Sequence, residues 1–292
     1  MGRRIRLAVT PGDPAGVGPE ILRAALASDR LPGNVEWIEV SPPASGPGHP
    51  TPDGAKSAWE CLEECARLAG SGAVDGVVTG PVCKSSLREV GFPFPGQTEF
   101  FADRAGVTDF AMCLTSPRLT VGLVTAHVPL AEVPARVTAG EIFRIGRLLA
   151  AFVASRRGGG IPIAVAGLNP HAGENGQLGT EEQCIIAPAV QALNAAMPFG
   201  QSFQGPFSPD TIFHRATRGE FSAVLCMYHD QGLIPLKLDG FDEGVNTTLG
   251  LPFVRTSPDH GTAFAIAGSG EARPDSMIAA MRLAAEIAEK RP

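Results

Sequence analysis

No pattern in this sequence indicates disulfide bonds, nucleic-acid binding or membrane insertion. The six cysteines form no CxxC pair, so neither a disulfide framework nor a thiolate zinc site is indicated. The formal net charge is -6, and the basic residues form no cluster larger than pairs such as Arg3-Arg4, which argues against a surface that wraps a polyanion. No uninterrupted apolar span reaches membrane length, and Pro11, Gly12 and Asp13 interrupt the start before a signal-peptide core can form. We expect a soluble, cytoplasmic protein with no nucleic-acid or membrane partner.

The usual dinucleotide-binding fingerprint is missing as well. Residues 5–9 predict a buried strand that runs into a loop with Gly12, Gly16 and Gly18, and Pro19 suits the first turn of a following helix. This glycine spacing is not GxGxxG, so an ordinary Rossmann signature is absent. A tight structural turn explains the loop about as well as a ligand contact does.

Strand and helix patterns alternate along the rest of the chain, which is typical of an α/β protein. Buried strands are predicted at residues 5–9, 35–40, 74–79, 163–166, 223–227, 245–249 and 253–256. Helices are predicted at residues 53–68, from Thr138 to about Ser155, and at 275–290, and residues 110–114 and 119–125 predict an antiparallel hairpin. With 292 residues the chain is long enough for two domains, and we place the first crossing at Gln97.

Three histidines, His127, His171 and His229, each follow the end of a predicted strand. The carboxyl ends of strands in one open α/β sheet converge, so these imidazoles can meet although they are far apart in sequence. Neutral imidazoles bind zinc and similar metals, and three protein ligands leave positions open for a substrate. Nothing here has the tight spacing of a metal signature, so three unrelated loop histidines remain the alternative.

Several long motifs occur in a fixed order: GDPAGVGPE, PGQTEFFA, TAHVPL, GLNPHAGENGQLGTEE, GPFSPDTIF, MYHDQGLIPLK and GVNTTLGLPFVRTSPDHGTAFAIAG. Through them the chain resembles the 4-hydroxythreonine-4-phosphate dehydrogenase family of pyridoxal phosphate biosynthesis, from about Leu7 to the last helix. A more distant likeness to isopropylmalate and isocitrate dehydrogenases lies in GDPAGVGPE against their GDGIGPE, and in HGTAFAIAG against their HGSAPDIAG. The resemblance implies an isopropylmalate-dehydrogenase-like three-layer αβα fold with a mostly parallel mixed sheet, and an active site in the cleft between two domains.

The resemblance also implies what the domains and residues do. Residues 1–96 plus 245–292 would bind the nucleotide, and residues 97–244 would bind metal and substrate and form the dimer. The metal ligands would be His127, His171 and His229; the substrate contacts Gln97, Thr98, Lys237, Asn246 and Arg255; and the cofactor contacts Gly12, Asp13, His260, Gly261, Thr262 and Ala263. The implied cofactors are NAD or NADP and a divalent metal, which is zinc or else cobalt, manganese or magnesium.

The implied reaction is oxidation of 4-phosphohydroxy-L-threonine to a β-keto acid, which loses carbon dioxide to give 3-amino-2-oxopropyl phosphate. Asp210 and Lys237 are our candidates for proton transfer, and Arg255 suits a phosphate or carboxylate through its fork of donors. Stabilising a helix N-terminus is an equally good explanation of Asp210. Where the family has PGHTEF, this chain has Gln97, which can donate a hydrogen bond but cannot carry charge or move a proton.

Four other functions stay open at this stage. Gln97 keeps open a sister dehydrogenase that acts on 4-phospho-threonate, 4-phospho-erythronate or a cyclic dihydrodiol. Lys237, Asn246 and Arg255 favour an acyclic phosphorylated acid over an aromatic diol. A phosphate acyltransferase would not explain the three histidines, and a non-catalytic binding protein should have lost some of them.

The resemblance implies a homodimer whose metal site draws on both subunits. We expect the apolar residues Phe92, Phe94, Phe100 and Phe101 to supply its interface, with packing inside one chain as the alternative.

Overall fold

The computed structural model of the chain describes residues 4–43, 45–198 and 200–291. The chain forms two compact units: the first consists of Met1–Thr108 and Asp242–Pro292, and the second of Asp109–Phe241. The sequence predicted the boundaries between the two domains after residues 96 and 244. The first crossing lies later because helix α4 (Gln97–Arg104) packs inside the first unit, where Arg104 Nη2 lies 2.7 Å from Oε1 of Glu63.

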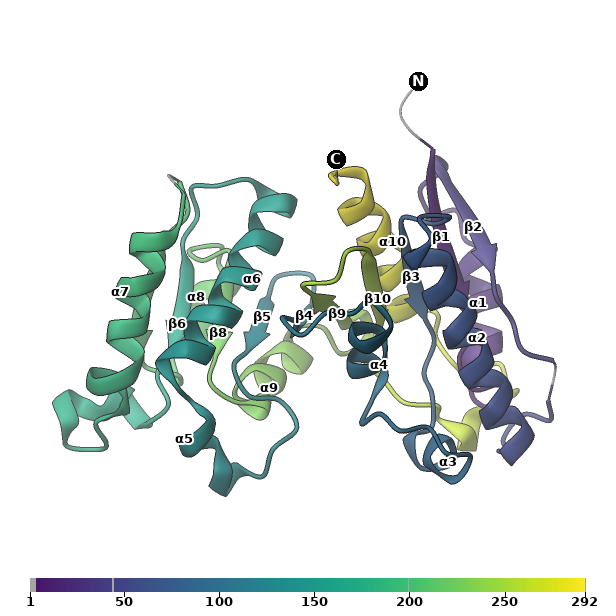
Figure 1. The fold of residues 1–292 in the computed structure, drawn as a ribbon, viewed down its shortest axis with the longest axis horizontal. Helices are drawn as coiled ribbons and strands as arrows, with labels where there is room; N and C mark the ends of the chain where they lie inside the picture. Colours follow the sequence, from purple (N-terminus) through teal and green to yellow (C-terminus); the bar gives the residue numbers. More distant parts are fainter. Residues whose placement is uncertain (1–3, 44, 199, 292) are drawn as a thin grey trace. The chain divides into compact units, whose positions relative to one another are not determined.

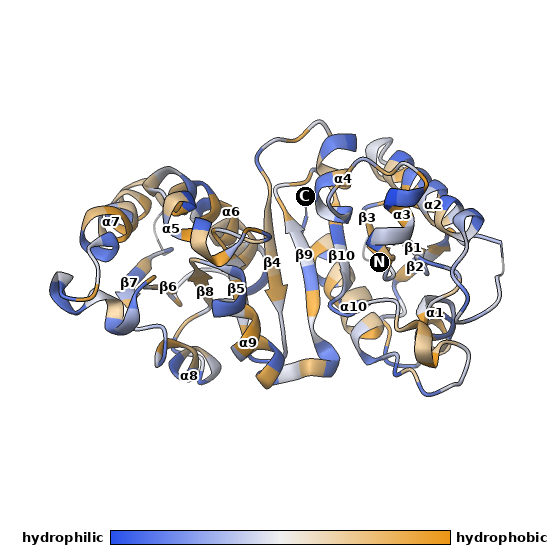
Figure 2. Ribbon diagram, turned by 90° about the horizontal axis from the view of Figure 1, so that it is seen from below, coloured by the Kyte–Doolittle hydropathy of each residue, from blue (hydrophilic) through white to orange (hydrophobic). Residues whose placement is uncertain are grey.

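The first unit is a five-stranded sheet between two layers of helices (Figure 1). Its strands are β1 (Ile5–Thr10), β2 (Val35–Glu39), β3 (Gly76–Thr79), β9 (Val245–Leu249) and β10 (Val254–Pro258). The strand order is β2-β1-β3-β10-β9, and every pair is parallel except β10 with β9. Its other helices are α1 (Gly18–Leu26), α2 (Pro52–Gly70), α3 (Lys84–Glu89) and α10 (Asp275–Glu289). Figure 2 shows α1 and α10 on one face of the sheet and α2 and α4 on the other.

The second unit has the same layered plan. Its strands are β4 (Ala111–Thr115), β5 (Thr120–Leu123), β6 (Ile163–Ala166), β7 (Phe203–Phe207) and β8 (Ala223–Cys226). They follow the order β4-β5-β8-β6-β7, in which β4 and β5 form an antiparallel hairpin and the other pairs are parallel. Its helices are α5 (Val133–Arg136), α6 (Ala139–Arg157), α7 (Ala187–Ala196), α8 (Ile212–Thr217) and α9 (His229–Gly240). In Figure 2, α6 and α7 cover one face, and α8 and α9 cover the other.

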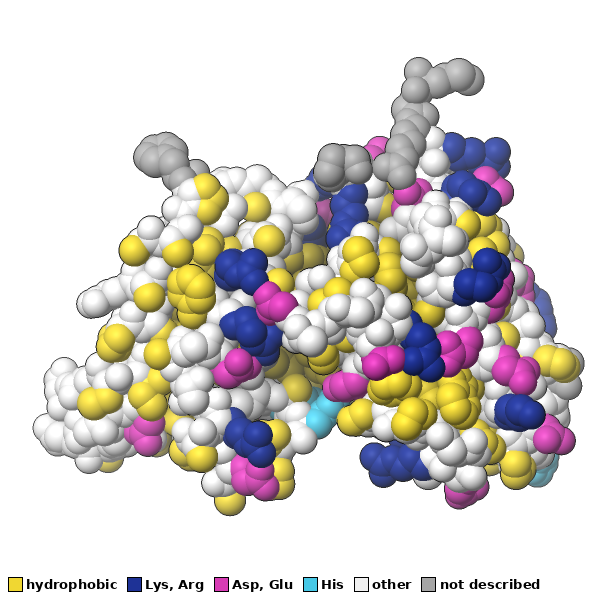
Figure 3. Space-filling model, in the orientation of Figure 1, with side chains coloured by type: hydrophobic (Ala, Val, Ile, Leu, Met, Phe, Trp, Pro, Cys, Tyr) yellow, Lys and Arg dark blue, Asp and Glu magenta, His cyan; other side chains and the backbone are white. Residues whose placement is uncertain are grey.

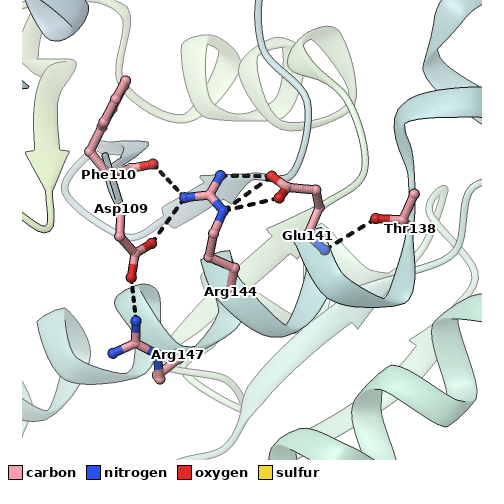
Figure 4. Close-up of polar contacts among 6 residues, drawn as sticks. All are labelled: Asp109, Phe110, Thr138, Glu141, Arg144 and Arg147. Atoms are coloured by element: carbon pink, nitrogen blue, oxygen red, sulfur yellow. Dashed lines mark hydrogen bonds and ion pairs between the residues drawn. The ribbon is translucent and has the colours of Figure 1, made fainter. Parts of the chain in front are cut away.

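Helix α6 anchors the beginning of the second unit. The Thr138 hydroxyl accepts a hydrogen bond from Glu141 N at 3.2 Å and so caps the helix, as the sequence predicted. One turn on, the Arg144 guanidinium donates to Phe110 O at 2.8 Å, to Asp109 Oδ1 at 3.1 Å and to the Glu141 carboxylate (Figure 4). Because one side chain joins the cap of α6 to the first residues of the unit, the hairpin that follows Phe110 enters the sheet at a fixed position.

The α/β class, the mostly parallel sheet and the antiparallel hairpin are confirmed. Figure 2 shows an informative contrast between two strands: β4 is hydrophobic along its length, whereas β10 is partly hydrophilic. All five residues of β10 are nevertheless buried, including Arg255. Polar side chains on a fully buried strand must find partners, which makes β10 a candidate for the functional site.

The phenylalanines that we expected to form a dimer interface are instead part of the core of the first unit. Phe92, Phe100 and Phe101 are buried, and their rings pack edge to face or tilted against one another and against Phe94 and Trp59. An apolar interface between two copies of the chain would therefore be formed by other residues.

The surface and the helices agree with the charge pattern of the sequence. On the face drawn in Figure 3, basic and acidic side chains stand next to one another. The 19-residue helices α2 and α6 both carry several charged side chains, and none of the described helices has the length and hydropathy of a transmembrane span.

The buried carboxylate of Asp239 on α9 should make the free energy of unfolding depend on pH in the acidic range. It accepts hydrogen bonds from Ser116 Oγ at 2.6 Å and Arg118 Nε at 2.7 Å. Burial alone would raise the pKa of Asp239, but these hydrogen bonds outweigh it and lower the pKa. Its stabilising effect is thus complete above the unfolded-state pKa of about 3.9 and is lost as the pH falls through the lower folded-state value.

We predict that Asp239→Asn lowers the free energy of unfolding by about 2 kcal/mol at pH 7, because charge-assisted hydrogen bonds to a buried group are lost. Urea unfolding at pH 7 and at about pH 3 measures this, and the difference from the wild type should shrink at the lower pH. The exposed Asp29→Asn serves as the control and should change stability by less than about 0.5 kcal/mol. Equal destabilisation at both pH values would contradict the prediction.

Candidate active site

Arg255 on β10 is a buried cation in the first unit. Its exposed fraction is 2%, and burial lowers its pKa to about 10, so it stays protonated at neutral pH. The Nη2 of Arg255 donates to Thr79 Oγ1 at 3.0 Å and to Gln97 Oε1 at 3.1 Å, and both acceptors are neutral. Its Nε is buried and has no hydrogen-bond partner among the described residues. A buried guanidinium with an unsatisfied donor is a candidate site for an anion.

Gln97 has a fixed orientation at the start of α4. Its Nε2 donates to Gly80 O at 3.1 Å, which leaves Oε1 directed at Arg255. The side chain therefore orients the guanidinium. Thr98, the next expected substrate contact, is buried on the same helical turn, but no hydrogen bond from it to Arg255 is described.

Asn246 on β9 lies on the same face of the sheet as Arg255. Asn246 pairs with Ser257, which lies two residues beyond Arg255 on β10, and side chains two apart on a strand share a face. Its Oδ1 is buried without a hydrogen-bond partner in the described part of the chain. Arg255 and Gln97 are thus in contact, and Asn246 lies on the same face of the sheet. Thr79 and Thr248 were missed, although Thr79 follows its strand directly and Thr248 lies two residues after Asn246.

His127 and His229 lie together in the second unit. Their ring centroids are 5.7 Å apart, and with Tyr228 and Asp230 they line a cavity of about 430 Å³. The sequence predicted only that His229 follows a strand, and the structure has it as the first residue of α9. The turn is held by Gln231, whose Oε1 accepts from Met227 N and whose Nε2 donates to Gly167 O, both at 2.7 Å.

His171 lies on a strained turn at the carboxyl end of β6. Residues 171–175 all have positive φ, from Glu174 at 42° to Gly173 at 79°, which is costly for residues other than glycine. The loop is held by Glu182, a buried carboxylate that accepts from Leu168 N and Asn169 N, both at 2.7 Å. Strain that is maintained by surrounding contacts is a frequent feature of functional sites.

Two of the histidines have the hydrogen bonds that metal-ligating imidazoles usually make. His171 Nδ1 lies 2.8 Å from Glu174 Oε1, and His229 Nδ1 lies 2.6 Å from Asp230 Oδ1. A carboxylate at Nδ1 makes that nitrogen the donor and leaves Nε2 with the lone pair that a metal needs. The donor set therefore fits a divalent transition metal. We had not identified Glu174 and Asp230, although each lies within three residues of its histidine.

The three histidines do not form one metal site in this chain. Among the described residues no three histidine, cysteine or acidic side chains are grouped closely enough to hold a metal ion. His171 is instead close to Asp210, whose pKa is lowered by a hydrogen bond from Ser208 and, to a lesser extent, by the charge of His171. A lowered pKa makes Asp210 a weak base at neutral pH. Lys237 lies eight residues after His229, about 12 Å along α9.

The expected cofactor segments are neighbours in the first unit. Val17 N donates to Thr262 O at 2.9 Å, and a Cβ at Gly16 would lie 2.8 Å from that oxygen. Gly12 adopts φ 79°, and a Cβ there would lie 2.3 Å from Pro81 O, so the turn requires glycine. The segment His260–Ala263 is therefore held against the glycine loop, and burial raises the pKa of Asp13 within that loop.

Comparisons with known proteins agree with this arrangement. The family model described as "Pyridoxal phosphate biosynthetic protein PdxA" matches residues 18–284. The chain belongs to this family. It is 44% identical over 331 residues to 4-hydroxythreonine-4-phosphate dehydrogenase of Erythrobacter litoralis, covering 98% of this chain and 97% of that protein. The family expected from the motifs is thereby confirmed.

Solved structures give the same result. A 4-hydroxythreonine-4-phosphate dehydrogenase from Klebsiella pneumoniae has a TM-score of 0.82 and 36% identity, covering 98% of this chain and all of that one. A β-decarboxylating dehydrogenase from Thermococcus kodakarensis has a TM-score of 0.53 and 19% identity, covering 94% of this chain and 80% of that chain, so it shares the fold alone. The chain is thus a member of an oxidoreductase family, on a fold that also occurs in β-decarboxylating dehydrogenases.

Proposed function

We propose that the protein oxidises 4-phosphohydroxy-L-threonine to a β-keto acid, which decarboxylates to 3-amino-2-oxopropyl phosphate in pyridoxal 5′-phosphate biosynthesis. The observation that carries this proposal is Arg255, a buried cation whose hydrogen-bond partners are neutral and whose Nε has no partner among the described residues. A phosphate or carboxylate supplies the charge and the acceptors that this guanidinium lacks. The Oδ1 of Asn246, on the same face, is an acceptor for a substrate hydroxyl or ammonium group.

The chain's own residues have separate roles in the proposed reaction. Arg255 binds the anionic group, and Gln97 keeps the guanidinium oriented. The imidazoles of His127, His171 and His229 would hold a divalent metal, which as a Lewis acid makes a substrate alcohol more acidic. A nicotinamide dinucleotide, NAD or NADP, would accept the hydride. Lys237 is the stronger candidate for proton transfer because the lowered pKa of Asp210 disfavours it as a base.

Steady-state turnover of the metal-loaded protein tests the proposal. We expect 4-phosphohydroxy-L-threonine to be oxidised with a higher kcat/KM than 4-phospho-threonate or 4-phospho-erythronate. Because Gln97 replaces the family histidine, Gln97→His should be compared on all three substrates. Preference of the wild type for a phosphorylated sugar acid would support the sister dehydrogenase instead, and acyl transfer without a nicotinamide cofactor would contradict both.

We predict that Gly261→Leu raises the KM for the dinucleotide by about tenfold and changes the substrate KM little. No atom of the described residues lies within 4 Å of a Cβ built at Gly261, so the larger side chain can be accommodated without disturbing the fold and would occupy space needed by the ligand. Initial rates at varied cofactor and substrate give both constants. A rise in the substrate KM alone would mean that the two ligands are assigned to the wrong segments.

We further propose a homodimer whose metal site draws on both subunits. The three histidines of one chain do not gather into a single metal site, so a second chain would complete it. The end of helix α9 offers an interface, because Ile234 and Leu238 of the helix and Phe241, the residue that follows it, are 61%, 83% and 73% exposed and lie at i, i+4 and i+7. An exposed apolar helix face of this kind is suited to pairing with its own copy.

If the site is shared, a mixture of inactive His127→Ala and Lys237→Ala proteins should regain part of the activity, provided that subunits exchange and these residues come from opposite chains. Leu238→Asp should shift the sedimentation coefficient towards a monomer and reduce activity, because it places a charge in the apolar face of α9. The exposed Leu178→Asp is the matched control, and it should remain dimeric. A wild type that sediments as a fully active monomer would refute the shared site.

A further inference from the structure

The carboxyl ends of β6 and β8 are joined by a side chain and not only by the backbone. The two strands pair in parallel from Ile163 with Ala223 to Val165 with Leu225, and the same register would bring residue 167 opposite residue 227. Beyond this ladder the amide of Gln231 connects those two residues. Ligands of α/β proteins bind at this edge of the sheet, so the spacing of the two strand ends matters for the site.

Gln231 is buried, and both of its polar atoms are used. It is 7% exposed, its Oε1 accepts from Met227 N and its Nε2 donates to Gly167 O, both at 2.7 Å. Gln231 is the third residue of α9, so its side chain reaches back over the start of the helix in the manner of a capping box. Glutamine suits this position because it presents one acceptor and one donor at the end of a single side chain.

The end of β8 is also joined to the end of β5, which leads to His127. Thr125 donates to Met227 O twice, from Oγ1 at 2.8 Å and from N at 3.1 Å. Met227 is thus held through its N by Gln231 and through its O by Thr125. His127 follows Thr125 by two residues and His229 follows Met227 by two residues. These bonds fix the two strand ends from which the neighbouring imidazoles extend, with ring centroids 5.7 Å apart.

On the other side, Gly167 leads into the strained turn that carries His171. Gly167 N donates to Phe207 O at 2.8 Å, so the end of β6 is also fixed to β7. The turn folds back onto Gly167, since a Cβ there would lie 3.0 Å from Ala172 Cα and 3.1 Å from Glu182 Oε1. A shift of Gly167 would therefore move the turn and its imidazole.

We infer that Gln231 is a positioning residue, which holds the strand ends of His127, His171 and His229 at fixed distances, so that each imidazole is in place before a divalent metal binds. The inference rests on the proposed metal-dependent function. Gln231 acts through the backbone, because both of its polar atoms are engaged there. Without its amide, one buried N–H and one buried carbonyl would lose their partner, and the strand ends would shift to find others. Residues that orient metal ligands in this way affect metal affinity without touching the metal.

Titration of the metal-free protein with Co²⁺, followed by the visible absorption of the bound ion, tests this role apart from turnover. Gln231→Met has nearly the same length but cannot make either hydrogen bond, and it should raise the Kd for Co²⁺ by about 10- to 100-fold. Thr125→Val removes one hydrogen bond between β5 and β8 and should raise this Kd by about threefold. Asn194→Leu is the matched control, because the Asn194 amide likewise bridges a backbone N–H and a carbonyl, both of Phe203, at the opposite edge of the same sheet. Its Kd for Co²⁺ should equal that of the wild type.

Urea unfolding of the same proteins separates positioning from stability. If Gln231→Met is destabilised but binds Co²⁺ like the wild type, Gln231 serves the fold alone and the inference is overturned. If Gln231→Met does not fold, an unchanged Kd in Thr125→Val overturns it, and so does a wild type that binds no Co²⁺. A wild type that shows the expected graded Kd values, but oxidises 4-phosphohydroxy-L-threonine with neither NAD nor NADP, would refute the proposed function and leave the role of Gln231 standing.

Discussion

Arg255→Met should lower kcat/KM by roughly 10²- to 10³-fold, mainly through a higher substrate KM, while the free energy of unfolding stays equal or rises. Removing one partner of a buried charge pair costs about 2–5 kcal/mol of binding, and the substrate anion is the partner proposed here. In the free protein the described hydrogen bonds of the guanidinium go to the neutral oxygens of Thr79, Thr248 and Gln97, and the carboxylate of Glu99 acts on it only through its charge. An apolar side chain of similar volume in place of such a charge is often neutral or stabilising.

Two measurements separate this prediction from a general loss of structure. Inorganic phosphate or the substrate should raise the Tm of the wild type, because a ligand that binds only the folded state stabilises it, and should not raise the Tm of Arg255→Met. Arg30→Met is the matched control, since Arg30 is an exposed arginine of the same unit, paired with Asp275, and its kcat/KM should not change. A destabilised Arg255→Met with normal KM would show that Arg255 serves the fold and not the substrate.

The buried strands could be predicted from sequence because each depends on a local run of apolar residues. β6 (Ile163–Ala166) and β9 (Val245–Leu249) were placed at their observed bounds. Helix α9 was missed because Gly232 and Pro235 lie within it. Gly232 is nevertheless required there, since a Cβ would lie 3.1 Å from Cys226 Sγ and from Leu123 Cδ2, so close packing on the sheet overrides local propensity.

The site was predictable as a set of residue types but not as a geometry. Arg255 and Gln97 were recognised separately, and only the register of β10 with β3, in which Arg255 pairs with Val77, places Thr79 beside the guanidinium. The left-handed turn at residues 171–175 has no local signal, because most of its residues are not glycine and the buried Glu182 maintains it. Long-range hydrogen bonds of this kind leave no periodic pattern in a sequence.

The packing of the first unit also explains why the boundary predicted from the sequence, after residue 96, lies before the observed one. Gln97 begins a new helix after a proline-containing loop, which is a reasonable pattern for a linker. Helix α4 stays with the first unit because Phe100 and Phe101 are fully buried there and Phe101 packs against Phe253 with ring centroids 6.2 Å apart. The consequence is functional, since Gln97 and Arg255 belong to one compact unit and can keep their hydrogen bond whatever the second unit does.

The second large effect is expected at the histidines. His229→Ala should lose bound divalent metal and lower kcat by at least about 10³-fold, since a Lewis acid contributes several kcal/mol to such a reaction. His171 needs a different substitution, because its φ of 51° strains alanine, whereas asparagine tolerates the left-handed region. His171→Asn should therefore fold normally and still lose the metal.

Metal analysis of the purified proteins provides a readout that does not depend on turnover. The exposed loop histidine His49→Ala is the control and should retain full metal content. Glu174→Gln and Asp230→Asn should weaken metal binding by about 10- to 100-fold without abolishing it, because they change only the carboxylate that orients each imidazole. A graded order, in which the ligand variants lose more metal than the carboxylate variants and His49→Ala loses none, follows from direct coordination by the imidazoles. If His171→Asn and His229→Ala keep the metal content and turnover of the wild type, these histidines are ordinary loop residues and the metal assignment is wrong.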